Sequence, residues 1–256
     1  MAKIIAVANQ KGGVGKTTTC VNLACALHLS KKRVLLVDMD PQGHSSIGFG
    51  ANKHDALPTV YDLIRNSTPI SHIIRKTPYG DLLPASTNLA AAEVELISVE
   101  NRHHILRDAL SEVSANYDFI IIDCPPSLGM LTINSLCAAK SVLVPVDCGF
   151  YALEGLSALT GTMSTIKKSL NPDLDIEGVL LTMFDSRTNL SVQIAQEVKR
   201  FFPKKVFATS IPRNVRLAEA PSHGKPVMEY DKHSRGADCY MKLAAEIISK
   251  SKKEAL

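Results

Sequence analysis

A loop suited to binding phosphate groups lies near the start of the chain: Lys11-Gly12-Gly13-Val14-Gly15-Lys16-Thr17-Thr18. Glycines allow successive backbone N–H groups to turn toward anionic oxygens, and a helix that begins at the loop adds its positive end. In such a loop Lys16 contacts the β- and γ-phosphates, and the Thr17 hydroxyl ligates Mg²⁺. The strict G-x-x-x-x-G-K-[ST] pattern fails because its first position is Gln10. A strand-like run before the loop and a helical pattern after it still favour nucleotide binding over an ordinary glycine-rich turn.

Two further apolar runs end in carboxylates. Asp38 and Asp40 follow residues 34–37, and Asp123 follows four apolar residues, 119–122. Because ligands of open parallel sheets lie beyond the carboxyl ends of the strands, we expect these acids to converge on the glycine-rich loop. Asp123 has the placement of a Walker-B aspartate, which holds Mg²⁺ through water. Each acid alone is more simply explained as an exposed loop residue, but together with Lys16 they favour a nucleotide site.

The elements that must position these groups alternate along the chain. Seven short runs rich in β-branched residues are predicted strands: 4–8, 33–38, 81–85, 118–123, 141–146, 178–183 and 206–211. Helical apolar stripes lie between them, such as Cys20, Leu23, Ala24 and Leu27, or Ile194, Val198 and Phe201. This alternation predicts an α/β fold, a three-layer P-loop NTPase fold with a mostly parallel, doubly wound central sheet. Residues 1–256 contain no internal repeat or low-complexity linker, so we expect a single domain.

The composition excludes several classes of protein. With 256 residues and a net charge of +4, the chain is neither a highly charged disordered polymer nor too short for a core. No run of about 18 apolar residues predicts a membrane span. Residues 1–8 lack a small-residue cleavage site, and the six cysteines form no Cys-x-x-Cys pair, which is typical of buried thiols in a reducing compartment. We therefore expect a cytoplasmic protein.

Positive charge is concentrated in the last quarter of the chain. Residues 1–186 contain 15 basic and 18 acidic side chains, whereas residues 187–256 contain 14 basic and 7 acidic ones, a balance of +7. Such a segment suits a polyanionic partner, but a lysine-rich solvated surface gives the same count.

Three motifs together resemble the ParA/Soj chromosome- and plasmid-partitioning ATPases, which belong to the deviant-Walker-A (MinD/ParA) class. They are the loop 11–18, Asp38-Met-Asp40-Pro-Gln-Gly, and Asp123-Cys-Pro-Pro-Ser127-Leu-Gly129. Residues 151–155, 185–189 and 211–226 match the chromosomal Soj branch, so the resemblance covers nearly the whole chain. Longer plasmid ParA proteins carry an N-terminal DNA-binding extension, which we expect to be absent here because the first predicted strand begins so early.

The resemblance implies ATP and Mg²⁺ as cofactors and a role for each motif. Two ATP-loaded monomers close into a homodimer, and Lys11 crosses to the partner's phosphates, which couples dimerisation to the nucleotide. Lys11, Lys16 and Asp40 are then catalytic, with Asp40 orienting the attacking water. Asp38 supports the Mg²⁺ shell beside Thr17 and Asp123. Adenine is expected at Pro212, Arg213 and Asn214, and Ser127 and Gly129 lie on the switch-II loop.

The family also binds double-stranded DNA without sequence preference once it has dimerised. Arg187 and Arg216 match positions used on DNA, and further candidates are Lys199, Arg213, Lys225 and Lys242. An ion-paired surface residue is an equally good interpretation of each one. The resemblance also implies association with the nucleoid. Hydrolysis is expected to be stimulated by a ParB/Spo0J-like protein, whose basic N-terminal segment docks at the dimer interface.

Three alternatives remain open. A MinD-like membrane-associated division-site ATPase would need a terminal amphipathic helix, but Tyr240, Ala244, Ile247 and Ile248 form a stripe typical of a core-facing helix, so no membrane is expected. An iron–sulfur carrier of the same class would need thiolates, for which Cys124 and Cys137 are candidates by position. A non-hydrolysing nucleotide-binding adaptor is disfavoured by the presence of both Asp40 and Asp123.

Overall fold

A seven-stranded sheet forms the middle layer of the computed structural model, which describes residues 1–51, 58–149 and 152–254. The strand order is β3-β4-β2-β5-β1-β6-β7, and every neighbouring pair is parallel except β3–β4. The strands are β1 Lys3–Val7, β2 Val34–Asp38, β3 Arg75–Thr77, β4 Gly80–Leu83, β5 Phe119–Asp123, β6 Ser141–Asp147 and β7 Asp175–Thr182. The predicted doubly wound α/β fold is confirmed.

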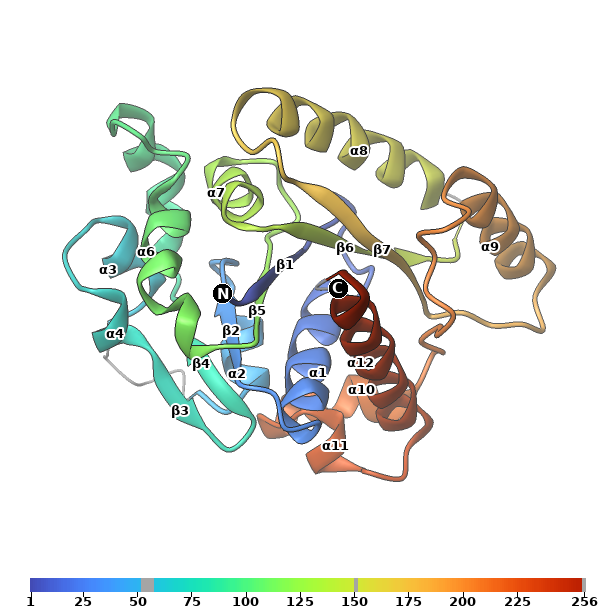
Figure 1. Cartoon of the computed structure of the whole chain (residues 1–256). Helices are drawn as coiled ribbons and strands as arrows, with labels where there is room; N and C mark the ends of the chain where they lie inside the picture. The colour runs from blue at the N-terminus through green and yellow to red at the C-terminus, as the bar shows by residue number, and fades with distance from the viewer. Residues whose placement is uncertain (52–57, 150–151, 255–256) are drawn as a thin grey trace.

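Helices cover both faces of this sheet (Figure 1). One face is covered by α1 Lys16–Leu29, α11 Val227–Tyr230 and α12 Arg235–Glu254. The other is covered by α3 Val60–Ile64, α4 Ile70–Ile73, α5 Leu89–Glu95, α6 Ile105–Val113, α7 Met130–Ala138, α8 Ala152–Ser169 and α9 Asn189–Phe201. The shorter elements are α2 His44–Gly48, α10 Val215–Glu219, and the 3₁₀ turns η1 Leu96–Ser98, η2 Ser114–Asn116 and η3 Ala220–His223.

The two faces have separate cores because the central strands are apolar at successive positions. In β5, Ile120 and Ile122 pack into the core under α6 and α7, whereas Phe119 and Ile121 pack into the core under α1 and α12. Such strands are buried on both sides, as parallel strands between two helical layers must be. The predicted stripe of α1 is confirmed, since Cys20, Leu23, Ala24 and Leu27 are all 0% exposed.

Some sequence predictions were wrong. Residues 206–211 do not form a strand: Val206 makes an isolated bridge to Val179, and Pro212, the residue after the segment, makes another to Phe184. The reason lies in α12, where the Glu246 carboxylate accepts hydrogen bonds from the backbone of Ala208 and Thr209 that a sheet neighbour would otherwise take. The antiparallel strand β3 was missed because its sequence is short and polar.

Phe201 was also misplaced. It was expected in the stripe of α9 but is 66% exposed, because it is the last residue of that helix; Val198, one turn earlier, is 0% exposed. Tyr151, the first residue of the matched stretch 151–155, lies outside the described residues.

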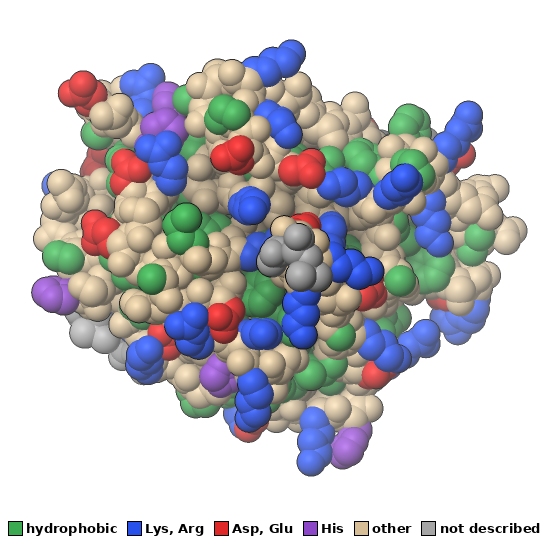
Figure 2. All heavy atoms as spheres, in the orientation of Figure 1, with side chains coloured by type: hydrophobic (Ala, Val, Ile, Leu, Met, Phe, Trp, Pro, Cys, Tyr) green, Lys and Arg blue, Asp and Glu red, His purple; other side chains and the backbone are tan. Residues whose placement is uncertain are grey.

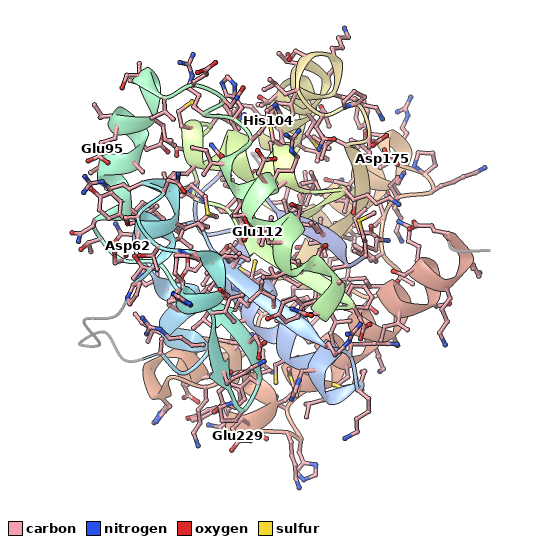
Figure 3. All side chains as sticks on the ribbon, turned by 60° about the vertical axis from the view of Figure 1, so that its left-hand side comes forward. Asp62, Glu95, His104, Glu112, Asp175 and Glu229 are labelled. Atoms are coloured by element: carbon pink, nitrogen blue, oxygen red, sulfur yellow. The ribbon has the colours of Figure 1, made fainter. Side chains whose placement is uncertain are left out.

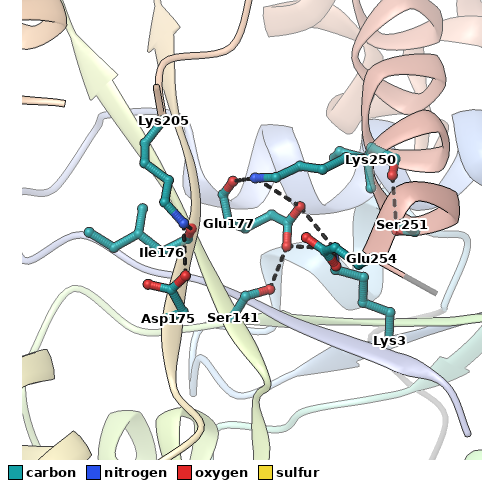
Figure 4. Close-up of polar contacts among 10 residues, drawn as sticks. Lys3, Ser141, Asp175, Ile176, Glu177, Lys205, Lys250, Ser251 and Glu254 are labelled. Atoms are coloured by element: carbon teal, nitrogen blue, oxygen red, sulfur yellow. Dashed lines mark hydrogen bonds and ion pairs between the residues drawn. The ribbon is translucent and has the colours of Figure 1, made fainter. Parts of the chain in front are cut away.

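A buried carboxylate ties the end of α12 to the sheet (Figure 4). Glu177 of β7 is 2% exposed, lies 2.8 Å from Lys3 Nζ and accepts a hydrogen bond of 2.7 Å from Ser141 Oγ. Two residues of α12 join this group, since Lys250 Nζ lies 3.5 Å from Glu177 and Glu254 lies 2.8 Å from Lys3. Burial by itself raises the pKa of Glu177, but the bonds from Lys3 and Ser141 outweigh it and leave the pKa below the usual value.

The predicted core-facing stripe of the last helix is confirmed. Tyr240, Ala244 and Ile247 of α12 are at most 1% exposed and pack against α1, and Ile248 packs against the same core. Within the described ranges, no helix combines the length and the apolar character that crossing a membrane requires.

Candidate active site

The glycine-rich loop connects β1 to α1, as predicted. Gly13 and Gly15 have φ values of 74° and 87°, a left-handed conformation that a side chain disfavours, and Gly15 is the N-cap of α1. A Cβ built on Gly12 or Gly13 meets no atom within 4 Å, so open space lies in front of this backbone. The loop is held from β7, where Thr182 Oγ1 donates a hydrogen bond of 2.9 Å to the carbonyl of Val14. An anchored loop with outward space at a helix N-terminus suits an anionic ligand.

Lys16 lies at the start of α1 and is 7% exposed. Its ammonium donates a hydrogen bond of 3.2 Å to the carbonyl oxygen of Lys11. Burial lowers the pKa of Lys16, and the negative charges of Asp123 and Asp40 oppose this shift. Lys16 therefore lies between the glycine-rich loop and the predicted acids Asp123 and Asp40.

Asp38 and Asp123 lie opposite each other on the neighbouring strands β2 and β5, and both are 0% exposed. The carboxylate of Asp38 accepts hydrogen bonds from the backbone N–H and hydroxyl of Ser46, at 2.8 and 2.7 Å, and from the backbone of Asp40 at 3.1 Å. Burial, with the charge of Asp123 added, raises the pKa of Asp38 to about 7. Asp38 is thus bound by α2 and by the loop that carries Asp40.

Asp123 retains an unsatisfied oxygen. Its Oδ2 accepts a 2.5 Å hydrogen bond from Ser45 Oγ, but its buried Oδ1 has no hydrogen-bond partner within the part of the chain that the structure describes. Burial raises the pKa of Asp123, against hydrogen bonds from the side chains of Ser45 and Thr17. A buried carboxylate oxygen without a donor is costly unless a cation or a water completes it. The acid, with the hydroxyl of Thr17 beside it, therefore offers oxygen ligands of the kind that Mg²⁺ prefers.

Asp40 is more accessible than either of these acids. Its Oδ1 accepts a hydrogen bond of 2.9 Å from the backbone of Gln42, and its carbonyl accepts another from Gly43, which begins the turn into α2. The side chain of Asp40 therefore lies at the edge of the site. The short loop that carries it is fixed by Asp38, whose carboxylate accepts hydrogen bonds from Asp40 before the turn and from Ser46 after it.

One contact at the candidate site was missed from the sequence. The ammonium of Lys11 lies 3.0 Å from both carboxylate oxygens of Asp147, the last residue of β6. Lys11 is also tied to Asn9, whose side-chain oxygen accepts its backbone N–H and whose amide reaches the carbonyl of Pro145. The signal was available, because Asp147 ends a predicted strand in the same way as Asp38 and Asp123.

A cavity of about 510 Å³ opens beside the loop. It is bounded by Thr17, Thr18 and Asn22 of α1, by α2, and by residues 220–222 of η3. This volume falls within the usual range for small-molecule sites. Among the described residues that line it, the predicted adenine contacts Pro212, Arg213 and Asn214 do not occur. The side chain of Asn214 instead caps α10 by accepting the N–H groups of Arg216 and Leu217.

The basic candidates are exposed and most of them carry intramolecular ion pairs. Arg187 makes two hydrogen bonds to Asp185, of 2.9 and 2.7 Å, and these bonds lower the pKa of Asp185 to about 2. Further pairs join Arg216 to Glu219 and Asp231, Lys225 to Glu229, and Lys242 to Asp238. In Figure 2, Lys and Arg side chains gather over the centre and right of the view, where α12 and α9 lie. A basic surface is present, but Arg187 and Arg216 are each already paired with an acid of the same chain.

The candidate thiols for an iron–sulfur site are buried. Cys124 and Cys137 are 1% and 4% exposed, and burial raises the pKa of Cys124 to about 12 and of Cys137 to about 11. Both are therefore protonated thiols at neutral pH.

Comparison with known proteins places this geometry in a family. Residues 2–176 match the family described as AAA domain. The chain is 56% identical over 251 residues to the sporulation initiation inhibitor protein Soj of Bacillus subtilis, which covers 97% of this chain and 99% of that protein. It is 51% identical to the chromosome partitioning protein ParA of Myxococcus xanthus, over 98% of this chain and 89% of that one. The chain belongs to the Soj/ParA family of chromosome-partitioning ATPases. The predicted family is confirmed.

Solved structures agree with this assignment of fold. A protein from Mycobacterium smegmatis titled cobyrinic acid a,c-diamide synthase, with bound ATP analogue and magnesium, has a TM-score of 0.87 and 36% identity, covering 98% of this chain and 96% of that one. The cell division ATPase MinD of Pyrococcus furiosus has a TM-score of 0.80 and 25% identity, covering 98% and 99%. The Soj/ParA chain therefore shares its fold with nucleotide-binding ATPases.

Proposed function

We propose that this Soj/ParA family member is a nucleotide-controlled switch for DNA partitioning. In the proposed cycle the chain binds ATP with Mg²⁺, closes into a homodimer, binds double-stranded DNA without sequence preference, and is reset by hydrolysis that a ParB/Spo0J-like partner stimulates. A single domain comprising residues 1–256 would carry out the whole cycle, on the nucleoid in the cytoplasm. The observation that carries the proposal is the convergence of Lys11, Lys16 and the pair Asp38–Asp123 at one end of the sheet.

The residues at the site have distinct tasks in this proposal. The backbone of residues 12–18 and Lys16 would hold the phosphates, while the cavity beside Thr18 would take the nucleoside. Thr17 and the unsatisfied oxygen of Asp123 would hold Mg²⁺, which when bound neutralises charge that develops on the phosphates. Asp38 would act through its bonds to Ser46 and the Asp40 loop, and so fix where Asp40 meets the attacking water.

Dimerisation would depend on Lys11. Its ammonium is held by Asp147 in the present structure, and a terminal phosphate of the partner offers a stronger anionic acceptor in a desolvated interface. Closing two triphosphates against each other requires added positive charge, which each Lys11 would supply. After hydrolysis the terminal phosphate is lost, so the reason for closure is lost as well.

DNA binding would follow from doubling the basic surface. Arg187 and Arg216, with Lys199, Lys225 and Lys242, would contact phosphates of the duplex. The contacts of Arg187, Arg216, Lys225 and Lys242 would each be weakened by the acid that already pairs with that side chain. Affinity from phosphate contacts falls steeply with salt, with a log–log slope of about −0.9 for each contact. A dimer presents two such surfaces, so ATP controls DNA binding through avidity.

Light scattering of the Asp40→Ala variant tests the proposal. With ATP and Mg²⁺ this hydrolysis-defective variant is expected to be dimeric, and with ADP monomeric. Lys16→Ala is expected to lose nucleotide binding, whereas Lys11→Ala keeps nucleotide but stays monomeric. Arg187→Ala with Arg216→Ala is expected to dimerise without retaining DNA. A monomeric Asp40→Ala protein at high concentration with ATP and Mg²⁺ would falsify the proposal.

A further inference from the structure

Two of the buried carboxylates in this protein have a cationic partner and two do not. Most acidic side chains lie at the surface, as Glu95 and Glu112 do in Figure 3. The buried ones in the described part of the chain are Asp38, Asp81, Asp123 and Glu177. Asp81 lies 2.6 Å from Lys76 Nζ, and Glu177 lies 2.8 Å from Lys3 Nζ. Within the described ranges no lysine or arginine forms such an ion pair with Asp38 or Asp123, the two acids of the candidate site.

Serine hydroxyls hold these two acids instead. Ser45 Oγ donates a hydrogen bond of 2.5 Å to Asp123 Oδ2, and Ser46 Oγ donates one of 2.7 Å to Asp38 Oδ2. Both serines are buried, at 0% and 4% exposed. A hydroxyl satisfies a lone pair of a carboxylate but brings no charge, so these bonds fix the acids without neutralising them. The arrangement leaves the negative charge of the pair for a cation that is not part of the chain.

The two hydroxyls hold their acids in different ways. Ser45 occupies Oδ2 of Asp123, and the other oxygen, Oδ1, is the one without a partner among the described residues. Ser46 binds Asp38 Oδ2 through its backbone N–H as well as its hydroxyl, while Oδ1 of Asp38 accepts the backbone N–H of Asp40. Ser45 therefore determines which oxygen of Asp123 stays open to a metal, whereas Ser46 is connected to Asp40 through Asp38.

Both serines belong to α2, which also borders the cavity beside the glycine-rich loop. The residues of α2 that line this cavity are His44, Ile47 and Gly48. They share one face of the helix, because positions three and four apart lie above one another. Ser45 and Ser46 lie between them in sequence and bond to the acids. A displacement of this short helix by an occupant of the cavity therefore moves both donors.

We propose that Ser45 and Ser46 are positioning residues with separate tasks, Ser45 for the metal site at Asp123 and Ser46 for the water that Asp40 orients. This inference rests on the proposed function and adds two residues that the sequence motifs did not identify. Ser45 holds the carboxylate of Asp123 so that one oxygen stays open for Mg²⁺. Ser46 holds Asp38 and, through it, the backbone of Asp40. Because both hydroxyls lie on the helix that borders the cavity, nucleoside and metal favour the same position of α2, and each strengthens the binding of the other.

Calorimetric titration of ADP with and without Mg²⁺ tests the task of Ser45. Mg²⁺ is expected to tighten ADP binding to the unmodified protein. In Ser45→Ala this gain should shrink about tenfold, since loss of a group that orients a metal ligand weakens metal binding by about that factor or more. The affinity for ADP alone should stay unchanged, which also shows that the variant is folded. An undiminished gain, or an equal loss of ADP affinity with and without Mg²⁺, would overturn the assignment of Ser45.

Ser114→Ala is the matched control for this titration. Ser114 is buried at 7% exposed, its hydroxyl bonds to the backbone carbonyl of Ser111, and it precedes β5 at the opposite edge of the sheet from Asp123. The gain from Mg²⁺ should be the same in this variant as in the unmodified protein. A loss as large as that of Ser45→Ala would show that removal of any buried hydroxyl has this effect, and would contradict a specific role.

Turnover at increasing Mg²⁺ separates the two serines. Excess Mg²⁺ should restore kcat to Ser45→Ala, because its defect lies in metal affinity. Ser46→Ala should keep the gain in ADP affinity from Mg²⁺ but show a kcat lower by about tenfold that excess Mg²⁺ does not restore, since Asp40 is less well fixed. The same response in both variants would refute the separate tasks. An unmodified protein that binds no ADP with Mg²⁺ would contradict the proposed function itself, whereas normal binding with unaffected serine variants would contradict this inference alone.

Discussion

The buried carboxylates Asp38 and Asp123 should make the nucleotide-free protein less stable as the pH rises. Burial raises the pKa of Asp38 to about 7, with a further contribution from Asp123, whose own pKa is raised by burial. A group with a folded-state pKa above its unfolded value binds its proton more tightly in the folded state. Stability is therefore lost as the pH rises from the unfolded pKa, about 4, through the folded one. One such group gives a slope of about −1.4 kcal/mol per pH unit and a total of roughly 4 kcal/mol.

Asp123→Asn isolates this effect because it removes the like charge that faces Asp38. Urea unfolding in EDTA, between about pH 5 and pH 8, gives the free energy of unfolding of both proteins. We expect the variant to have a shallower slope and to exceed the unmodified protein by roughly 2 kcal/mol at the alkaline end. Taking the difference between the two proteins cancels the titration of histidines that they share.

Two controls complete this test. Asp185→Asn removes a half-buried carboxyl with a pKa of about 2, which titrates below this window, so the slope should not change. Addition of ATP with Mg²⁺ at high pH should restore stability to the unmodified protein and not to Asp123→Asn. If the free energy of unfolding has the same pH slope in the unmodified protein and in Asp123→Asn, the pair Asp38–Asp123 does not hold a proton. The argument that these buried carboxylates need a cation would then be refuted as well.

Three further perturbations probe other contacts. Asp147→Asn loosens Lys11 from an ion pair that is partly exposed and worth about 1 kcal/mol, and a symmetric dimer contains two such lysines, so light scattering should detect ATP-dependent dimers at about thirtyfold lower protein concentration. Glu177→Gln removes the buried carboxylate that pairs with Lys3, leaves that ammonium only the exposed Glu254, and should cost roughly 3 kcal/mol in urea unfolding. That loss should shrink as the pH falls through the lowered pKa of Glu177, because the protonated carboxyl no longer contributes; a loss that is constant with pH would contradict the ionic origin. Thr182→Val removes the bond to Val14 at nearly constant volume and should cost about 1 kcal/mol, with weaker nucleotide binding by calorimetry; unchanged binding would show that the loop needs no anchor.

The sequence predicted the centre of the sheet well because burial on both faces leaves a simple signal. In β5, Phe119-Ile120-Ile121-Ile122 is apolar throughout, and Asp123 marks its end. Since parallel strands end at the same edge, the rule for open sheets predicts that Asp38 and Asp123 lie at that edge, and the structure adds that their strands are neighbours. The periphery carries a weaker signal. Nothing local in residues 206–211 shows that Glu246, which is distant in sequence, takes the backbone bonds of a strand.

The sequence predicted which residues meet at the candidate site, but not the hydrogen bonds and the ion pair that hold them there. Residue types and spacing identified Lys16, Thr17 and the acids, because their chemistry depends on the loop and the strand ends alone. The bonds from Ser46 to Asp38 and from Ser45 to Asp123 depend on the first turn of α2, which begins six residues beyond the strand. The pairing of Lys11 with Asp147 depends on β6 lying next to β1, an order of strands that the sequence does not specify.

The intramolecular ion pairs give a physical reason why the proposed ATP-dependent binding of DNA would be easily reversed. Lys11 is held by Asp147, Arg187 by Asp185, and Arg216 by Glu219, so each proposed contact to a phosphate replaces a carboxylate of the same chain. An exposed or partly exposed pair of this kind contributes about 1 kcal/mol, and a phosphate in place of the carboxylate gains only the difference. No single exchange is then decisive, and a stable complex requires several at once. In the proposed cycle, dimerisation would supply that number and hydrolysis would remove it, so DNA binding would depend on the nucleotide although the basic residues of each monomer stay the same.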